Sequence, residues 1–260
     1  MQYGPSVILV SCLLAAPALG ETLVEPGAGP GNAQGPAPFN YYGSAGSHVQ
    51  EIYASRLFAG PVSIDGFSFR AYPGAAPSFF FGNTVNISNA VIRLSTTQAG
   101  ADESGSLPSA DFADNLGMDA TTVYSGALTL TTAATGMDPQ PFDYTVNFST
   151  PFLYNPGAGN LLLDVVIPSG ATVSGAGFGF LTFDTVNTLD DGIYSVVNIA
   201  DGGAGMGTLS TAGAITAFSV TASAPEPATW LLGIVGFGML GVAGLRRGAG
   251  RRDRLCAPLS

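Results

Sequence analysis

Short segments in which apolar and polar residues alternate run through the chain from about position 39 to position 221. This period of two is typical of strands in a sheet with one buried face, and clusters of Gly, Pro, Asn and Asp separate the segments. No internal window sustains helical spacing with good helix formers. The clearest alternations place these residues on the buried face: Phe67, Phe69 and Ala71; Ala90, Ile92 and Leu94; and Tyr144, Val146 and Phe148. The pattern predicts an all-β fold.

Later segments complete the expected set of strands. Residues 161–167 are apolar on both faces apart from Asp164, as in the central strand of a sheet. Three more strands are expected at 178–183, 193–199 and 215–220. With roughly nine strands and no shift in composition that would ask for a second domain, we expect a single jelly-roll-like β-sandwich over residues 39–222.

The charges are few and strongly segregated. Charged residues make up 10% of the chain, against about 25% in an ordinary soluble domain. Hydrophobic residues remain at 46%, which is enough to build a core. Lysine is absent, and positions 21–224 hold 16 acidic residues against three arginines, a net charge of −13. Such a surface repels phosphate groups and anionic lipids, which excludes nucleic acid as a partner.

The first 20 residues have the features of a secretory signal peptide. Residues 7–19 carry no charge, and the small residues Ala18 and Gly20 flank Leu19 at the spacing that signal peptidase requires. This apolar segment is too short to span a bilayer of about 30 Å as a helix. We therefore expect export with cleavage after Gly20, followed by a Gly- and Pro-rich flexible linker over residues 21–38.

A second apolar segment lies near the C-terminus. Residues 228–245 hold no charge, and as a helix they would cover about 27 Å, close to one hydrocarbon thickness. The basic residues that follow at once are Arg246, Arg247, Arg251, Arg252 and Arg254. The positive-inside rule assigns this tail, 246–254, to the cytoplasm and everything before the helix to the exterior. The alternative, a buried core helix, would have to bring the arginines into a folded domain.

The residues just before this transmembrane candidate are Pro225-Glu226-Pro227. The block from Pro225 to Arg247 resembles a PEP-CTERM sorting signal, in which this motif precedes a glycine-punctuated transmembrane helix and an Arg cluster. The resemblance implies a Gram-negative bacterium that makes extracellular polysaccharide, and a membrane protease, an exosortase, that processes the chain near the motif. It also implies an inner-membrane intermediate, followed by delivery to the cell surface or the extracellular space. We assign residues 223–254 to this signal.

Few kinds of catalysis are open to the exterior domain. Because the chain has no lysine, it cannot form a phosphate-binding GxxxxGK[ST] loop or a Schiff base. His48 is the only histidine, which excludes multi-histidine metal sites, and no serine has the flanking glycines of a nucleophile elbow. Cys12 and Cys256 fall in the two terminal signals, so the exterior has no cysteine. We interpret His48 as a solvated loop residue and expect no enzymatic activity.

Calcium and sugar binding are the alternatives that the residues leave open. Residues 190–192 and 201–207 are weak calcium-loop candidates, because neither has the Asp spacing of a calcium loop, and plain turns are favoured for both. Residues 41–42 and 79–81 are aromatic runs suited to a sugar platform, but packing in the core is favoured. No cofactor or metal site is therefore predicted, with Ca²⁺ as the alternative.

Taken together, these features predict a non-enzymatic exported protein of the cell surface or extracellular matrix, associated with biofilm or exopolysaccharide. One alternative is a lectin-like β-sandwich that binds polysaccharide, with or without calcium. Another is a glycan hydrolase that uses two acidic residues. The expected partners are the membrane, an exosortase and extracellular polysaccharide.

Overall fold

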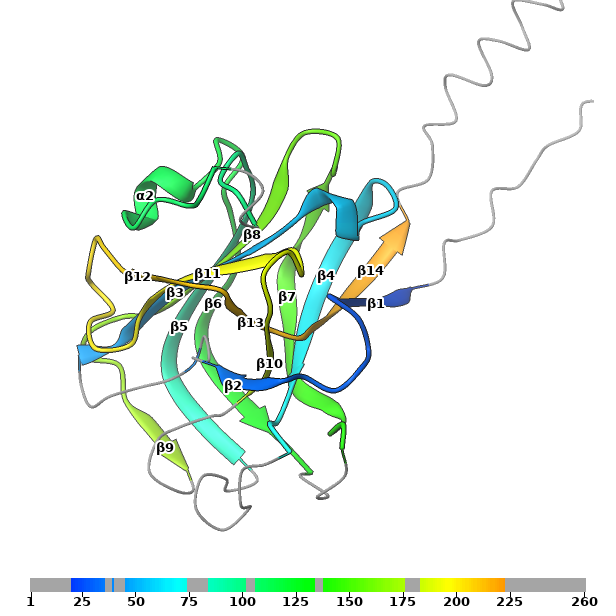
Figure 1. The fold of residues 1–260 in the computed structure, drawn as a ribbon. Helices are drawn as coiled ribbons and strands as arrows, with labels where there is room; N and C mark the ends of the chain where they lie inside the picture. The colour runs from blue at the N-terminus through cyan, green and yellow to red at the C-terminus, as the bar shows by residue number, and fades with distance from the viewer. Residues whose placement is uncertain are drawn as a thin grey trace, which may run out of the picture. The chain divides into compact units, whose positions relative to one another are not determined.

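Two antiparallel sheets face each other in the structure (Figure 1). The computed structural model describes residues 20–35, 39, 45–73, 84–101, 106–133, 138–175 and 183–222. The first sheet has the order β1-β14-β4-β7, with bounds Glu21–Glu25, Thr216–Ala222, Val62–Arg70 and Phe142–Tyr154. The second has the order β12-β11-β3-β8-β5-β6, with bounds Thr208–Ser210, Ile193–Asn198, Ser47–Tyr53, Asn160–Ile167, Thr84–Thr97 and Thr121–Thr131.

Smaller elements complete the fold. β9 (Val173–Gly175) pairs with β5, and a small third sheet has the order β13-β10-β2, with bounds Ala212–Ala214, Phe183–Asn187 and Ala33–Gly35. The helical elements among the described residues are a 3₁₀ turn at Ser55–Leu57 and the one-turn helix α2 at Phe112–Asn115. The all-β sandwich that the sequence predicts is confirmed. The described part of the chain holds fourteen strands rather than nine, because four strands of three residues are too short to show an alternation and β1 falls in the range predicted to be a linker.

Sheet neighbours come from distant parts of the chain. In the first sheet the last strand, β14, lies between β1 and β4, and in the second β8 lies between β3 and β5. Between β3 and β8 the chain crosses repeatedly from one sheet to the other. One sheet has the order β1-β14-β4-β7, and the facing sheet contains the order β3-β8-β5-β6. These interleaved orders are those of a jelly roll, in which two Greek keys fold together. β12 and β11 extend the second sheet beyond β3.

One hydrophobic core fills the space between the two large sheets. The residues that the alternation places on the buried face are buried, except that Phe148 is only partly so. The ring of Tyr53 on β3 packs edge-on against Phe218 on β14, with ring centroids 5.0 Å apart. β8 is the central strand that residues 161–167 predict, with β3 on one side and β5 on the other. The predicted strands at 193–199 and 215–220 correspond to β11 and β14, while most of 178–183 lies outside the described residues.

The prediction that residues 21–38 form a flexible linker is wrong for the two strands within this range. β1 pairs with β14 along its whole length, from Glu21 opposite Val220 to Glu25 opposite Thr216. β2 pairs with β10, with Gly35 opposite Phe183. Residues 26–38 are Gly- and Pro-rich, and β1 and β2 are only five and three residues long, so long-range pairing decides their conformation. The folded domain therefore begins at β1 and not near Phe39.

A buried ion pair fixes the segment between β1 and β2. Arg70 of β4 is 1% exposed, although the alternation predicts an outward position for it. Its Nε donates to Asp184 Oδ2 on β10 at 2.8 Å, and its terminal nitrogens donate to the carbonyls of Ala28 and Gly29. The same Asp184 oxygen accepts the backbone N–H of Gly31 at 3.1 Å. One arginine thus ties residues 28–31 to two strands.

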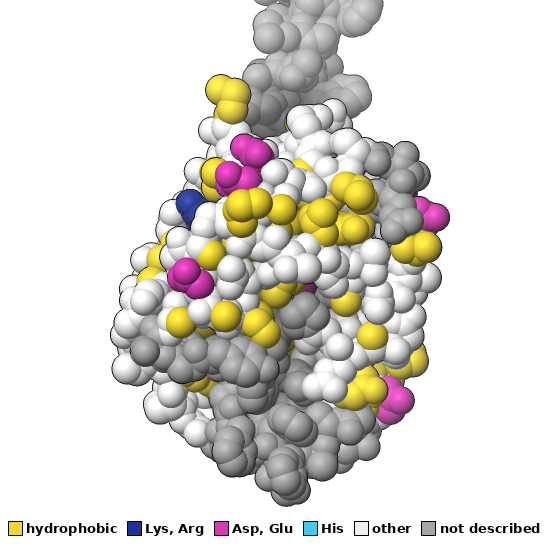
Figure 2. Space-filling view, turned by 60° about the vertical axis from the view of Figure 1, so that its left-hand side comes forward, with side chains coloured by type: hydrophobic (Ala, Val, Ile, Leu, Met, Phe, Trp, Pro, Cys, Tyr) yellow, Lys and Arg dark blue, Asp and Glu magenta, His cyan; other side chains and the backbone are white. Residues whose placement is uncertain are grey.

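The outer surface of the sandwich is acidic and carries few bases. Acidic side chains are dispersed over the face in Figure 2, between polar and hydrophobic ones. Of the three arginines at positions 21–224, Arg70 is buried and Arg93 is paired with a carboxylate. Glu25, Glu51, Asp164 and Asp184 are buried, and the other described acidic residues give the outside of the fold its negative charge.

Replacing Arg70 with methionine should destabilise the domain by about 3–5 kcal/mol, because it leaves the Asp184 carboxylate buried without its cation. Urea unfolding of the full chain would measure the change. The double variant R70M/D184N removes both charges and should recover much of the loss. If R70M alone leaves the unfolding midpoint unchanged, the buried pair does not hold the segment as described.

Candidate functional site

Most of the residues that the sequence assigns to the two signals lie outside the described part of the structure. These residues are Ala18, Pro225, Glu226, Pro227, Arg246, Arg247, Arg251, Arg252 and Arg254. The aromatic runs at 41–42 and 79–81 also lie outside it. Gly20 is described, is exposed, and stands directly before β1. Within the described ranges no helix is long and apolar enough to cross a membrane, and the candidate at 228–245 does not fall in them.

The two ends of the described domain belong to paired strands. Glu21, the first residue of β1, lies opposite Val220 in the antiparallel ladder, and β14 ends two residues later at Ala222. The predicted cleavage point after Gly20 therefore lies at the end of the β1–β14 pair where β14 finishes and the C-terminal signal begins in the sequence. The described domain ends with this strand, and the chain divides after Ser223.

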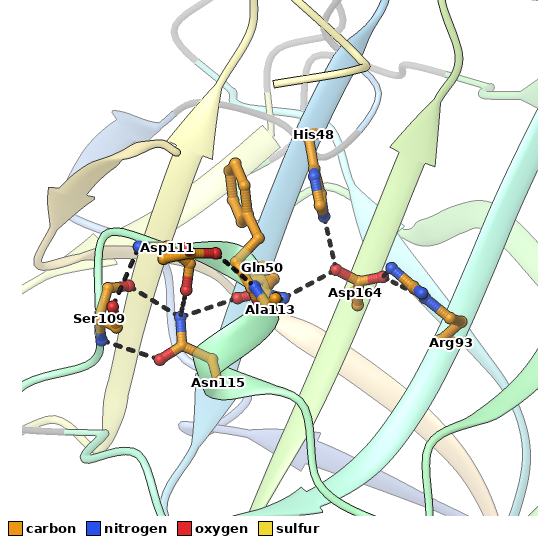
Figure 3. A network of polar contacts seen from close by, with 9 residues as sticks. His48, Gln50, Arg93, Ser109, Asp111, Ala113, Asn115 and Asp164 are labelled. Atoms are coloured by element: carbon orange, nitrogen blue, oxygen red, sulfur yellow. Dashed lines mark hydrogen bonds and ion pairs between the residues drawn. The ribbon is translucent and has the colours of Figure 1, made fainter. Parts of the chain in front are cut away.

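A buried polar network occupies the outer face of the second sheet (Figure 3). Its centre is Asp164 on the central strand β8, which is fully buried. The ladder places Gln50 of β3 on one side of Asp164 and Arg93 of β5 on the other. Asp164 Oδ1 accepts from His48 Nε2 at 2.7 Å and from Gln50 Nε2 at 2.9 Å, while Oδ2 accepts from Arg93 Nε at 2.7 Å. A single carboxylate thus joins three neighbouring strands.

The connection between β5 and β6 covers this network. Residues 98–120 carry α2, and the Phe112 ring stacks on the His48 imidazole with centroids 3.7 Å apart and an interplanar angle of 17°. The Phe112 carbonyl accepts from Gln50 Nε2 at 2.9 Å, and Asn115 Nδ2 donates to Gln50 Oε1 at 3.0 Å. Asp111 caps the helix by accepting from the backbone N–H of Ala113 at 2.9 Å. Gln50 therefore links the sheet to its cover.

The cover also packs closely against the strand edge at Gly207. The Gly207 N–H donates to the carbonyl of Ala110 at 2.8 Å. A Cβ at this position would lie 2.7 Å from Phe112 Cζ and 2.9 Å from Val196 Cγ1, so a side chain here would displace the Phe112 ring or the Val196 side chain. Glycine avoids this displacement.

The interpretation of His48 as a solvated loop residue is wrong. His48 is the second residue of β3, it is 8% exposed, and strands flank it on both sides. In the sequence alone, Gly46 and Ser47 directly before it indicate a loop. The isolated polar residue Asp164 in an apolar strand was the one signal that could have indicated a buried partner for this histidine.

The charges of the network set the ionisation of Asp164. Burial by itself raises the pKa of this carboxyl, but the hydrogen bond and charge of His48, the charge of Arg93 and the hydrogen bond from Gln50 together hold it below its ordinary value. Asp164 is therefore ionised, with both oxygens engaged by donors. Such an arrangement stabilises the sheet and its cover, and it presents no free carboxylate oxygen to a ligand.

The calcium-loop candidates form turns. Asp191 accepts from the backbone N–H groups of Ile193 at 2.9 Å and Thr188 at 3.2 Å. Asp201 accepts from the N–H of Gly203 at 2.8 Å. Both loops are turns in the structure, and calcium binding at either of them stays an untested alternative. Among the residues with a described position, no three His, Cys, Asp or Glu side chains are grouped so as to hold a metal ion.

A surface pocket lies beside the cover, at the end of β5. Its volume is about 460 Å³, within the range of small-ligand sites. Gln98, Asp114 and Asp119 contribute polar groups to its lining, and Leu116 and Met118 contribute apolar ones. The combination of carboxylates, an amide and apolar side chains suits a ligand that carries both hydroxyls and C–H surface.

Comparison with known proteins decides the nature of the C-terminal segment. The family model of the PEP-CTERM protein-sorting motif matches residues 223–247. The chain carries a PEP-CTERM sorting motif. The resemblance noted from Pro225 to Arg247 is thereby confirmed, and the motif begins with the residue that follows β14. No curated protein and no solved structure matches the chain.

Replacing Asp164 with asparagine should destabilise the domain by about 3 kcal/mol, because it breaks a buried ion pair. This value is near the lower end of the range for such pairs, since the Arg93 side chain is still 32% exposed to water. The lowered pKa means that the contribution of Asp164 is complete above its unfolded pKa of about 3.9 and is lost as the pH falls through the folded value. The gap between wild type and variant should therefore narrow in acid. Chemical unfolding of the full chain at several pH values would measure this.

Asp114→Asn, at an exposed carboxylate of the same cover, is the matched control and should change stability by less than about 0.5 kcal/mol. A loss in Asp114→Asn equal to that in Asp164→Asn would contradict the central role of Asp164.

Proposed function

We propose that this protein is an exported exosortase substrate whose β-sandwich is delivered to the cell surface or the extracellular matrix. The observation that carries the proposal is the sorting motif at residues 223–247, which begins directly after the last strand of the domain. Export through the membrane and recognition by an exosortase are what this motif implies. The mature protein would consist of the jelly roll with a short C-terminal extension.

The residues of the motif are suited to recognition beside a folded domain. Pro225 and Pro227 lack backbone N–H groups and fix φ, so they cannot prolong the ladder of β14. The residues before each proline are biased toward extended conformations. The motif therefore favours an extended and accessible backbone after Ala222, as a protease substrate requires.

The apolar residues 228–245 and the tail at 246–254 would then hold the chain in the inner membrane until processing. The basic cluster opposes translocation of the last residues, so the domain stays outside and the tail inside. Glycines at five positions in the apolar segment would allow close approach of another helix in the lipid. The processing enzyme is the natural candidate for that helix.

The N-terminal signal complements this topology. Cleavage after Gly20 would leave Glu21 as the first residue, and Glu21 is also the first residue of β1. The mature domain would thus keep its whole first strand and lose nothing that the fold needs. In this proposal the domain is non-enzymatic, and its role is to be a stable acidic module in a matrix of extracellular polysaccharide.

A lectin-like role is the second candidate, and the pocket beside α2 is the observation that favours it. The carboxylates of Asp114 and Asp119 can accept hydrogen bonds from sugar hydroxyls, and the fully exposed Met118 offers an apolar contact for a ring face. A calcium ion is an optional addition to this candidate.

Intact mass spectrometry of the protein from its native host tests the sorting proposal. We expect a chain that starts at Glu21 and ends close to Pro227, and a chain that retains its C-terminal helix in cells without the exosortase. A variant with Pro225→Ala and Pro227→Ala should accumulate in the unprocessed form. Pro156→Ala, in a turn of the domain, is the control and should be processed normally. Wild-type protein that still ends at Ser260 in normal cells would contradict the proposal.

Binding to the exopolysaccharide of the host tests the lectin-like role. Replacing Gln98 and Asp114 together with alanine should weaken binding at least tenfold, since two hydrogen-bonding groups of the pocket are lost. Glu21→Gln, at an exposed acid on β1, is the control. Isothermal titration with and without EDTA would measure the affinity and any need for calcium. Wild-type protein that does not bind the polymer under either condition would exclude this candidate.

A further inference from the structure

Glu51 is a carboxyl group buried between the two large sheets. It lies on β3, is 1% exposed, and faces the core side. Its ladder neighbours are Leu163 on β8 and Ser195 on β11. Among the described residues, no arginine or histidine forms an ion pair with it. Burying a carboxyl group without a cation is costly unless hydrogen bonds satisfy its oxygens.

The backbone of Ala214 supplies one such hydrogen bond. Ala214 belongs to the small strand β13, and its N–H donates to Glu51 Oε1 at 2.9 Å. Its carbonyl accepts from the Thr216 hydroxyl at 3.0 Å. Both backbone polar groups of this buried residue are thus satisfied by side chains, one from β3 and one from β14.

Tyr53 closes the network into a ring. Its hydroxyl oxygen is 2.7 Å from Glu51 Oε2 and 2.6 Å from Thr216 Oγ1. The ring therefore contains three oxygen–oxygen contacts: Glu51 to Tyr53, Tyr53 to Thr216, and Thr216 to the Ala214 carbonyl. Each contact at hydrogen-bond distance requires one hydrogen between its two oxygens.

A count of hydrogens determines the state of Glu51. Tyr53 and Thr216 each bring one hydroxyl hydrogen, and the Ala214 carbonyl brings none. Two hydrogens cannot fill three contacts, so with an ionised Glu51 one contact would be a repulsion between two lone pairs. A protonated Glu51 brings the missing hydrogen. It then donates to Tyr53, Tyr53 donates to Thr216, and Thr216 donates to the Ala214 carbonyl.

We propose that Glu51 is a neutral carboxylic acid in the folded protein, and that its ionisation is a pH-sensitive weak point where β3, β13 and β14 meet. Loss of the proton breaks one link of the ring and leaves a charge between the sheets. Because the sorting motif follows β14 directly, the weak point lies on the strand that joins the domain to this motif. This inference stands on the fold alone and does not depend on the proposed function.

The charged and titratable groups around Glu51 agree with this assignment. Tyr53 is the titratable group in contact with it, and burial raises the pKa of the tyrosine hydroxyl, so Tyr53 keeps its hydrogen. Glu25 is the ladder partner of Thr216 on β1 and is also buried. Asp184 on β10, whose backbone accepts from Ile215 beside Ala214, is paired with Arg70. No free cation among the described groups compensates a charge on Glu51.

Burial raises the pKa of Glu51 to about 7, even though its hydrogen bonds with Tyr53 and Ala214 oppose the shift. The unfolded chain loses this proton at its ordinary pKa of about 4.3. The stabilisation is therefore complete below about pH 4.3 and declines as the pH rises to 7, where the folded state also loses the proton. Burial raises the pKa of Glu25 to about 7 as well, so two groups contribute in this window.

The variant Glu51→Gln separates the contribution of Glu51 to the pH dependence of stability from that of Glu25. The measurement uses the full chain held in detergent. The amide of glutamine can donate from Nε2 to Tyr53 and accept from Ala214 through Oε1, so it imitates the protonated acid. We expect E51Q to match the wild type near pH 4.5 and to be more stable at pH 8. Between about pH 4.5 and 7, the unfolding constant of the wild type should rise with pH more steeply than that of E51Q. The difference should be a factor of up to ten for each pH unit. Glu21→Gln is the control and should follow the wild type.

Infrared spectroscopy of the wild type provides a test that needs no variant. At pH 6 exposed carboxyls are ionised, so the carbonyl band of a protonated acid should report buried groups and should vanish with a midpoint near pH 7. This band should weaken in E51Q and persist in Glu21→Gln. Absence of the band in the wild type at pH 6, or an equal pH dependence of stability in E51Q and wild type, would overturn the proposal.

Discussion

The insertion of β14 between β1 and β4 is the constraint on which the rest of the structure depends. β14 is the last strand of the domain but an internal strand of its sheet, so it gives both neighbours their hydrogen-bond partners. Phe218 from this strand packs against Tyr53 and closes the core toward the second sheet. Without β14, β1 has no partner and β4 becomes an exposed edge. The domain is therefore complete only when the residues just before the sorting motif have joined it.

Buried polar groups determine how the remaining elements attach to this frame. Arg70 and Asp184 hold the N-terminal segment, Asp164 holds three strands and the cover, and the Glu51 ring holds the small sheet. Each group is costly to bury, and its hydrogen bonds form only in this arrangement of the strands. Together they make the arrangement specific, in a domain whose apolar core alone would tolerate several.

Sequence reasoning succeeded where the signal was local and repeated. Alternation identified the core faces of β4, β5 and β7, and the apolar run at 161–167 identified the central strand β8. It failed for β1 and β2, because these strands have only five and three residues and the Gly- and Pro-rich residues around them indicate a linker. It also failed for Arg70, which sits on the side of β4 that alternation assigns to solvent but which a further strand and the N-terminal segment cover.

The sequence by itself determined the class of fold and the sorting motif, because each depends on residues within a few positions of one another. Only the tertiary structure decided the partners of the buried polar side chains. His48 and Asp164 are 116 residues apart, Arg70 and Asp184 are 114 apart, and Glu51 and Ala214 are 163 apart. Strand order brings these pairs together, and strand order follows from the packing of the whole chain rather than from any local pattern.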